Sequence, residues 1–134
     1  MISLINGTVR SLAIDRAVVE VGGVGLAISI TPATSASLNI GAPAQFFTSL
    51  VVREDSLTLY GFLDDDVKVL FELVQTVSGI GPKVALSLVA ALSPSQLGIA
   101  IAQEDIAAIE KVPGIGRKGA QRLILELKGK LSDF

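Results

Sequence analysis

The chain has 134 residues, a formal net charge of −2 at pH 7, and neither cysteine nor histidine. The lack of cysteine excludes disulfides and thiol catalysis, and the lack of histidine removes the commonest general base and zinc ligand. Half of the residues are hydrophobic, but no apolar run approaches the ~20 residues of a membrane span, and the N-terminus lacks the pattern of a secretory signal. We therefore expect a cytoplasmic binding protein with no catalytic residue, metal or cofactor.

The first 63 residues contain short apolar runs separated by turn residues, a pattern that predicts β-strands. The glycines within 22–25 suit a hairpin turn, because glycine readily adopts the positive φ that such turns require. Residues 31–39 are interpreted as the connection between the third and fourth strands. Five short strands in about sixty residues predict a small barrel of the OB type. The expected strands cover residues 1–14, 17–21, 25–30, 44–52 and 56–63.

From residue 64 onward the apolar residues recur at intervals of three and four, which predicts helices. Asp64 is a suitable cap for the first helix, and Ser93 followed by Pro94 is a suitable start for the third. We place the domain boundary between Leu63 and Asp64, so that a barrel domain (1–63) precedes an all-α domain (64–134) in an α+β chain. The expected helices cover residues 64–77, 82–92, 94–102, 104–112 and 117–131.

The segments VSGIGPKVALSLV (77–89) and VPGIGRKGAQRLI (112–124) share the pattern Val-x-Gly-Ile-Gly-x-Lys. Each segment follows one predicted helix and starts the next, and the pattern resembles the helix-hairpin-helix, a DNA-binding element that does not read base sequence. Glycines let the loop approach a phosphate, and the following helix presents unpaired N–H groups and a partial positive charge. Ile80 and Ile115 are expected to point inward and anchor each hairpin.

The basic residues gather around the second copy, which indicates how an acidic chain binds DNA. Residues 111–130 contain six basic residues and one acid, Glu126. Two hairpins that merely pack together would not call for cations at the helix starts. Because each subunit has few phosphate contacts, we expect several copies to act together. The predicted DNA-binding residues are Gly79, Gly81, Lys83, Gly114, Gly116, Arg117, Lys118 and Arg122.

Glu54 and Asp55 lie at the predicted turn of the second β-hairpin, where a solvated turn is the simplest interpretation. The order of the motifs, however, resembles the RuvA family over essentially the whole chain: a small barrel with VVRED and LYGF, followed by GIGPK and PGIGRK. The resemblance implies a subunit that binds four-way (Holliday) junction DNA in recombination and repair. It also implies a homotetramer or octamer, with Glu54 and Asp55 forming an acidic pin at the crossover.

The same resemblance implies protein partners. The chain lacks a Walker phosphate loop, so we expect the RuvB ATPase to drive branch migration, with the RuvC resolvase as a further partner. Family members dock on RuvB through a third, C-terminal domain, which we expect to be absent from this chain. The pin would repel phosphates at the centre while the hairpins hold the arms. This arrangement would select a four-way shape over a straight duplex without base contacts.

Two other functional interpretations stay open. A helix-hairpin-helix DNA-repair enzyme would use a lysine near the position of Lys118 as nucleophile, but only Asp133 supplies the downstream aspartate that such enzymes need. An accessory duplex-binding module would explain residues 64–131 but not the barrel. The acidic run 64–66 would suit Mg²⁺, although a helix start explains it more simply. Four aromatic residues of the first half would suit base stacking, although core packing or subunit contact fits them better: Phe46, Phe47, Tyr60 and Phe62.

Overall fold

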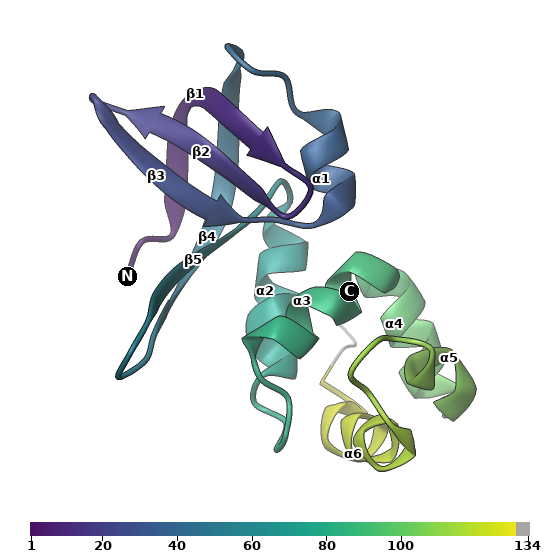
Figure 1. The fold of residues 1–134 in the computed structure, drawn as a ribbon. Helices are drawn as coiled ribbons and strands as arrows, with labels where there is room; N and C mark the ends of the chain where they lie inside the picture. Colours follow the sequence, from purple (N-terminus) through teal and green to yellow (C-terminus); the bar gives the residue numbers. More distant parts are fainter. Residues whose placement is uncertain (131–134) are drawn as a thin grey trace. The chain divides into compact units, whose positions relative to one another are not determined.

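The computed structural model describes residues 1–130, which divide into two compact units (Figure 1). The first unit is Met1–Lys68 and the second begins at Val69, so the division falls within helix α2 (Asp65–Val74). Residue 131, the end of the last predicted helix, and Asp133 lie outside the described residues.

The first unit is a closed barrel of five strands. The strands are β1 (Leu4–Ala13), β2 (Arg16–Val21), β3 (Val24–Ser29), β4 (Pro43–Val52) and β5 (Leu57–Phe62). Their order around the barrel is β1-β2-β3-β5-β4. Neighbouring strands are antiparallel, except that β3 and β5 run parallel and share two residue pairs, Ile28↔Leu59 and Ser29↔Tyr60. The predicted five-stranded barrel and α+β class are confirmed.

A tight turn joins β2 to β3 through two consecutive glycines with positive φ. Gly22 has a φ of 57° and Gly23 a φ of 86°, and the flanking Val21 and Val24 pair with each other. Two central residues with positive φ define a type I′ turn, whose twist matches that of antiparallel strands. The glycine-rich segment is thus the hairpin turn that the sequence predicts.

The barrel encloses an apolar core that β5 approaches closely at Gly61. An ideal Cβ atom on Gly61 would lie 2.5 Å from Ile28 Cγ2 and 3.2 Å from Phe46 Cδ1. Glycine at this position therefore lets the strand pass next to two core side chains. The buried core cluster consists of Ile5, Ala17, Val19, Ile28, Ile30, Phe46 and Leu59.

A short helix that the sequence analysis missed, α1 (Pro32–Ser37), lies in the connection between β3 and β4. Thr31 caps this helix by accepting a backbone hydrogen bond, and Pro32 occupies its first turn. The Ser35 hydroxyl donates to the Ala13 carbonyl at 2.6 Å, which attaches the connection to the end of β1. A Thr-Pro pair at the start of the segment is the signal that predicts such a helix.

The helices after the barrel follow the predicted order, and most are shorter than their predicted ranges. Ser93 and Gln96 form a capping box at the start of α4, as expected of the cap at Ser93. The Asp105 carboxylate accepts a hydrogen bond from the Ala108 N–H and caps α5. Besides α2, the helices are α3 (Pro82–Ala91), α4 (Pro94–Ala102), α5 (Ile106–Glu110) and α6 (Arg117–Leu127).

The turn between α4 and α5 holds Glu104 in the left-handed region, with a φ of 53°. The Glu104 N–H donates to the Ile101 carbonyl at 3.1 Å, and the Asp105 N–H donates to the Ala100 carbonyl at 2.8 Å. These two hydrogen bonds form a Schellman C-cap, in which glycine usually occupies the left-handed position. The glutamate backbone is therefore strained at this turn.

Substituting Gly61 with alanine tests the close approach of β5 to the core. Gly61→Ala is expected to lower the free energy of unfolding by about 1–3 kcal/mol, because the new methyl group overlaps the Ile28 side chain. Urea unfolding followed by circular dichroism measures this loss. Gly98→Ala is the matched control, since a Cβ atom there meets nothing within 4 Å and alanine stabilises a helix by about 1 kcal/mol over glycine. Equal stability of the two variants would contradict the predicted overlap.

Candidate nucleic-acid interface

The loops 77–81 and 112–116 have the same backbone structure. In each loop an isoleucine N–H donates to the carbonyl of the valine three residues earlier, at 3.1 Å in both cases. The first glycine of each loop is left-handed, with a φ of 88° at Gly79 and 90° at Gly114. A positive φ at the third position of such a turn defines type II and explains both glycines. The repeated sequence therefore builds a repeated structure.

The second glycine of each loop is not required by the fold. Gly81 and Gly116 directly precede α3 and α6, with φ values of −89° and −91° that any residue adopts readily. A Cβ atom at either position would meet nothing within 4 Å. Among residues 1–130, no side chain caps either helix. The first backbone N–H groups of both helices, which in α3 begin at Lys83 because Pro82 has none, are therefore uncapped. The open space beside them suits close approach by an anion.

The buried faces of the two hairpins also repeat at the same spacing. Ile80 and Ile115 are buried, with exposed fractions of 8% and 5%, which confirms that they point inward and anchor the loops. The helices that follow contribute fully buried residues at matching positions of the two copies. These pairs are Ala85 with Ala120, and Leu88 with Leu123.

Three predicted cations lie in the first turns of the helices that follow the loops. Lys83, Arg117 and Lys118 are all exposed. Arg117 Nη1 lies 3.9 Å from Glu110 Oε1, and the arginine side chain stays 72% exposed. A pair this long and exposed contributes little, so the charge of Arg117 remains accessible to an anion. The cations thus reinforce the positive ends of two uncapped helices.

Arg122, the remaining predicted cation, reaches the first loop although it belongs to the helix after the second. Its Nη1 atom donates to the Ser78 carbonyl at 3.1 Å. The contact joins α6 to the turn before α3, across 44 residues of sequence. The sequence pattern assigned Arg122 only a charge, because nothing in its spacing reveals this partner.

The predicted acidic residues Glu54 and Asp55 lie at the exposed tip of the β4–β5 hairpin. Val52 and Leu57 form the last cross-strand pair, and the Arg53 N–H closes the turn by donating to the Ser56 carbonyl at 2.9 Å. Figure 1 shows this hairpin extending beyond the other strands of the barrel. Val52 and Leu57 are 68% and 70% exposed, an apolar pair beside the acids that the sequence analysis did not single out.

Three of the four aromatic residues of the barrel are buried, which favours core packing, one of the two roles predicted for them. Phe46, Tyr60 and Phe62 have exposed fractions of 0%, 5% and 2%. Burial raises the pKa of the Tyr60 hydroxyl above its usual value, and the positive charge of Arg53 opposes that shift. These rings do not form an exposed platform on which bases stack.

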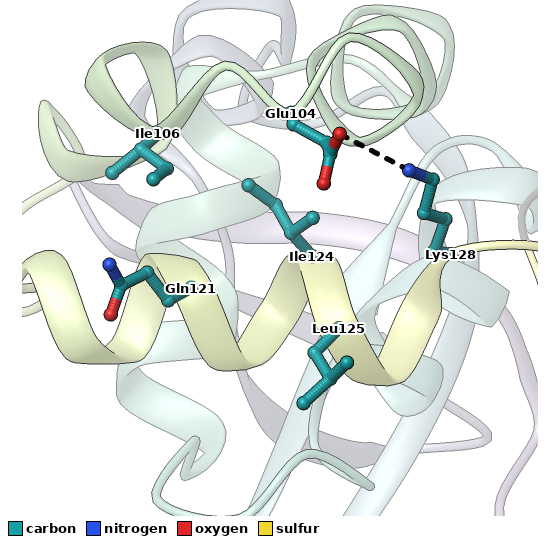
Figure 2. Close-up of a pocket in the computed structure, with 6 residues that line it drawn as sticks. All are labelled: Glu104, Ile106, Gln121, Ile124, Leu125 and Lys128. Atoms are coloured by element: carbon teal, nitrogen blue, oxygen red, sulfur yellow. Dashed lines mark ion pairs between the residues drawn. The ribbon is translucent and has the colours of Figure 1, made fainter.

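A groove of about 290 Å³ lies on the helical unit, outside both hairpin loops. Figure 2 shows the ion pair that borders it, in which Lys128 Nζ lies 3.4 Å from Glu104 Oε2. The groove is lined by Glu104, Ile106, Gln121, Ile124, Leu125 and Lys128. None of these six residues belongs to the predicted DNA-binding set.

Residues 1–130 contain neither a metal-binding cluster nor a single membrane-spanning helix. No group of three or more carboxylates there is placed to hold a metal ion, the acidic run 64–66 included. Within the same residues, no single helix is long and apolar enough to cross a membrane. The pair α3 and α4, bent by 94°, meets the length and composition criteria only when taken together.

Two family models match the chain, and together they cover both units. The model described as the RuvA N terminal domain matches residues 1–61. The model described as a SAM-like helix-hairpin-helix tandem matches residues 71–130.

Curated bacterial proteins are similar to this chain over nearly its whole length. The three described here are all named Holliday junction branch migration complex subunit RuvA. The Streptomyces coelicolor protein is 56% identical over 99% of this chain and 66% of its own length. The Acidothermus cellulolyticus protein is 56% identical over 98% of this chain and 67% of its own length. The Thermobifida fusca protein is 53% identical over 99% and 66%. The chain spans about two thirds of the length of these relatives.

The single tyrosine of the chain offers a direct test of the barrel geometry. Tyrosinate absorbance in the near ultraviolet reports Tyr60 alone, because the sequence contains one tyrosine and no tryptophan. We expect Tyr60 to titrate at a higher pH in the native protein than in denaturant, since burial disfavours the charged form. The raised pKa means that stability is intact below the unfolded pKa of about 10 and falls as the pH rises through the native pKa.

Arg53→Gln provides the control for this titration. Removing the positive charge that opposes the shift should raise the native pKa of Tyr60 further. A native titration that coincides with that of the denatured chain would contradict the burial of this hydroxyl.

Proposed function

This chain belongs to the RuvA family, and from that premise we propose that it binds four-way DNA junctions by their shape and catalyses no reaction itself. The observation that carries the proposal is the pair of loops with the same turn, each of which ends at an uncapped helix start. Its relatives are named as subunits of a Holliday junction branch migration complex. A structure-selective DNA-binding subunit accounts for both.

The two hairpins bind the phosphates of a duplex arm. The amides around Gly81 and Gly116 donate to phosphate oxygens, and the partial positive charge of each helix start adds to the attraction. Lys83 and Lys118, which follow the two loops at the same offset, supply full charges. Contacts of this kind fix the position of the protein on DNA without reading bases, so binding is independent of sequence.

The acidic hairpin tip acts at the point where the DNA strands cross. Four copies of the chain, or eight in two layers, bring their Glu54 and Asp55 side chains together at the centre of the junction. Like charges repel the phosphates there, while the hairpins hold the arms further out. A continuous duplex carries phosphates through the centre and is disfavoured, whereas an open four-way junction is accommodated.

The motor activity belongs to a partner. The sequence contains no Walker phosphate loop, so we assign ATP hydrolysis to the RuvB ATPase and contact with it to the third domain of the family. The RuvC resolvase is a further partner on the same junction. The complex works on chromosomal DNA in the cytoplasm.

The acidic tip is tested by comparing junction and duplex binding. Glu54→Gln combined with Asp55→Asn should raise the affinity for linear duplex, because the charges that repel central phosphates are gone. Fluorescence anisotropy at several salt concentrations, with a four-way junction and a duplex of equal length, measures the ratio of the two affinities. Asp15→Asn is the control, since it removes an exposed acid from another turn of the barrel. An unchanged ratio in the double variant would remove the role given to the tip.

The uncapped helix starts are tested at the second glycine of each loop. Gly81→Ala and Gly116→Ala should each weaken junction binding by about tenfold, because the methyl group occupies the space that a phosphate needs. Neither variant should disturb the fold, since that space contains no protein atom within 4 Å. Gly98→Ala, within α4, is the control and should bind as the parent does. Parental affinity in both loop variants would exclude these amides as the phosphate site.

A further inference from the structure

Arg122 holds the turn of the first hairpin from the helix of the second. Its Nη1 atom donates to the Ser78 carbonyl at 3.1 Å. An ideal Cβ atom on Gly79 would lie 3.2 Å from the same Nη1 atom, so the guanidinium also lies against the left-handed glycine of the turn. The arginine thus contacts the two central residues of the first loop.

The second loop has a matching contact of a different kind. An ideal Cβ atom on Gly114 would lie 3.2 Å from Val84 Cγ2 on α3. Each left-handed glycine therefore lies against the helix that follows the other loop. The contact of the second loop is apolar, whereas that of the first includes a hydrogen bond from a charged group.

The sequences of the two turns explain why only one has such a bond. The second position of the turn is Ser78 in the first loop and Pro113 in the second. Proline fixes φ near the value of about −65° that this position of a type II turn requires, so the second loop is rigid by itself. The two loops are 35 residues apart, so Ser87 on α3 is the counterpart of Arg122 on α6. Ser87 does not reach the second loop; its hydroxyl donates to the Lys83 carbonyl of its own helix. Serine lacks the restraint of proline, and Arg122 supplies a restraint from outside.

We propose that Arg122 is a positioning residue: it fixes the first loop in the turn that aims the α3 amides at a phosphate, in place of the restraint that Pro113 gives the second loop. The inference rests on the proposed function, because it concerns the same phosphate sites. It assigns Arg122 to the first hairpin rather than to a phosphate of its own. A residue of the second hairpin thereby holds the first hairpin in the conformation that binds a phosphate.

A rescue experiment separates this role from direct phosphate contact. Arg122→Ala should weaken junction binding by about tenfold, as loss of one hairpin does. Ser78→Pro alone should bind as the parent does, since the equivalent turn already contains Pro113. The double variant, Arg122→Ala with Ser78→Pro, should regain parental affinity, because proline restores the turn without restoring the charge. Gln121→Ala, the neighbouring exposed position on α6, is the truncation control.

Other binding results would overturn the proposal. If Ser78→Pro fails to rescue Arg122→Ala, and the salt dependence falls by the slope of about one phosphate contact in both backgrounds, Arg122 binds phosphate directly. Parental binding by Arg122→Ala, or weakened binding by Ser78→Pro alone, would also contradict it. Parental binding by Arg122→Ala would show that the first loop needs no restraint. Weakened binding by Ser78→Pro would show that the two turns are not equivalent.

Amide hydrogen exchange on the DNA-free protein tests the same restraint without any DNA. Arg122→Ala should speed exchange at Ile80, whose N–H closes the first turn, and should leave Ile115 of the second turn unchanged. Ser78→Pro should reverse the change at Ile80. Unchanged exchange at Ile80 in Arg122→Ala would refute the positioning role, whereas failure of the parent protein to prefer junctions would refute only the proposed function.

Discussion

The structure depends on a turn that ends one helix and starts the next without covering the amides of the new helix. Left-handed glycines at 79 and 114 make this turn possible, because a side chain at that φ is strained. The following glycines, 81 and 116, leave the helix starts uncapped and the adjacent space open. The side chains of Ile80 and Ile115 are buried and anchor the two loops. Folding of each hairpin therefore also forms the uncapped helix start at which we propose that a phosphate binds.

The distribution of charge accounts for the DNA binding that we propose for a chain with a net charge of −2. Backbone amides carry partial positive charge that does not enter the formal count, and the helix dipole concentrates it at two points. The side-chain cations add to it locally, mostly between residues 111 and 130, while Glu54 and Asp55 lie on a separate hairpin. Net charge alone is therefore a poor guide to the partner of this protein, because the position of each charge decides what it contacts.

The sequence predicted the elements well wherever a local signal determines them. The strand runs, the glycine turn at 22–23 and the helix start at Ser93 and Pro94 all correspond to local patterns, and the structure confirms them. Helix α1 was not predicted, because it is six residues long and buries no side chain and therefore has no apolar periodicity. The hydrogen bond from Arg122 to Ser78 could not be predicted from the sequence, since it joins residues 44 positions apart and depends on how the two hairpins pack together. Likewise the open space at Gly81 is a property of the surroundings that no sequence pattern contains.

The parallel seam between β3 and β5 has a consequence for the order of folding. Closing the barrel joins Ile28 to Leu59 and Ser29 to Tyr60, which are far apart in the sequence, whereas the β2–β3 hairpin and the helical loops need only local contacts. Non-local pairings form slowly, because the chain loses the entropy of closing a long loop before the new contacts stabilise it. The pairing of β1 with β4, which joins Leu4 to Phe47, is also non-local. Both pairings therefore form late, and until they do the edges of these strands are open to pairing with another chain. Before the barrel closes, these open strand edges are where partly folded chains would pair with one another.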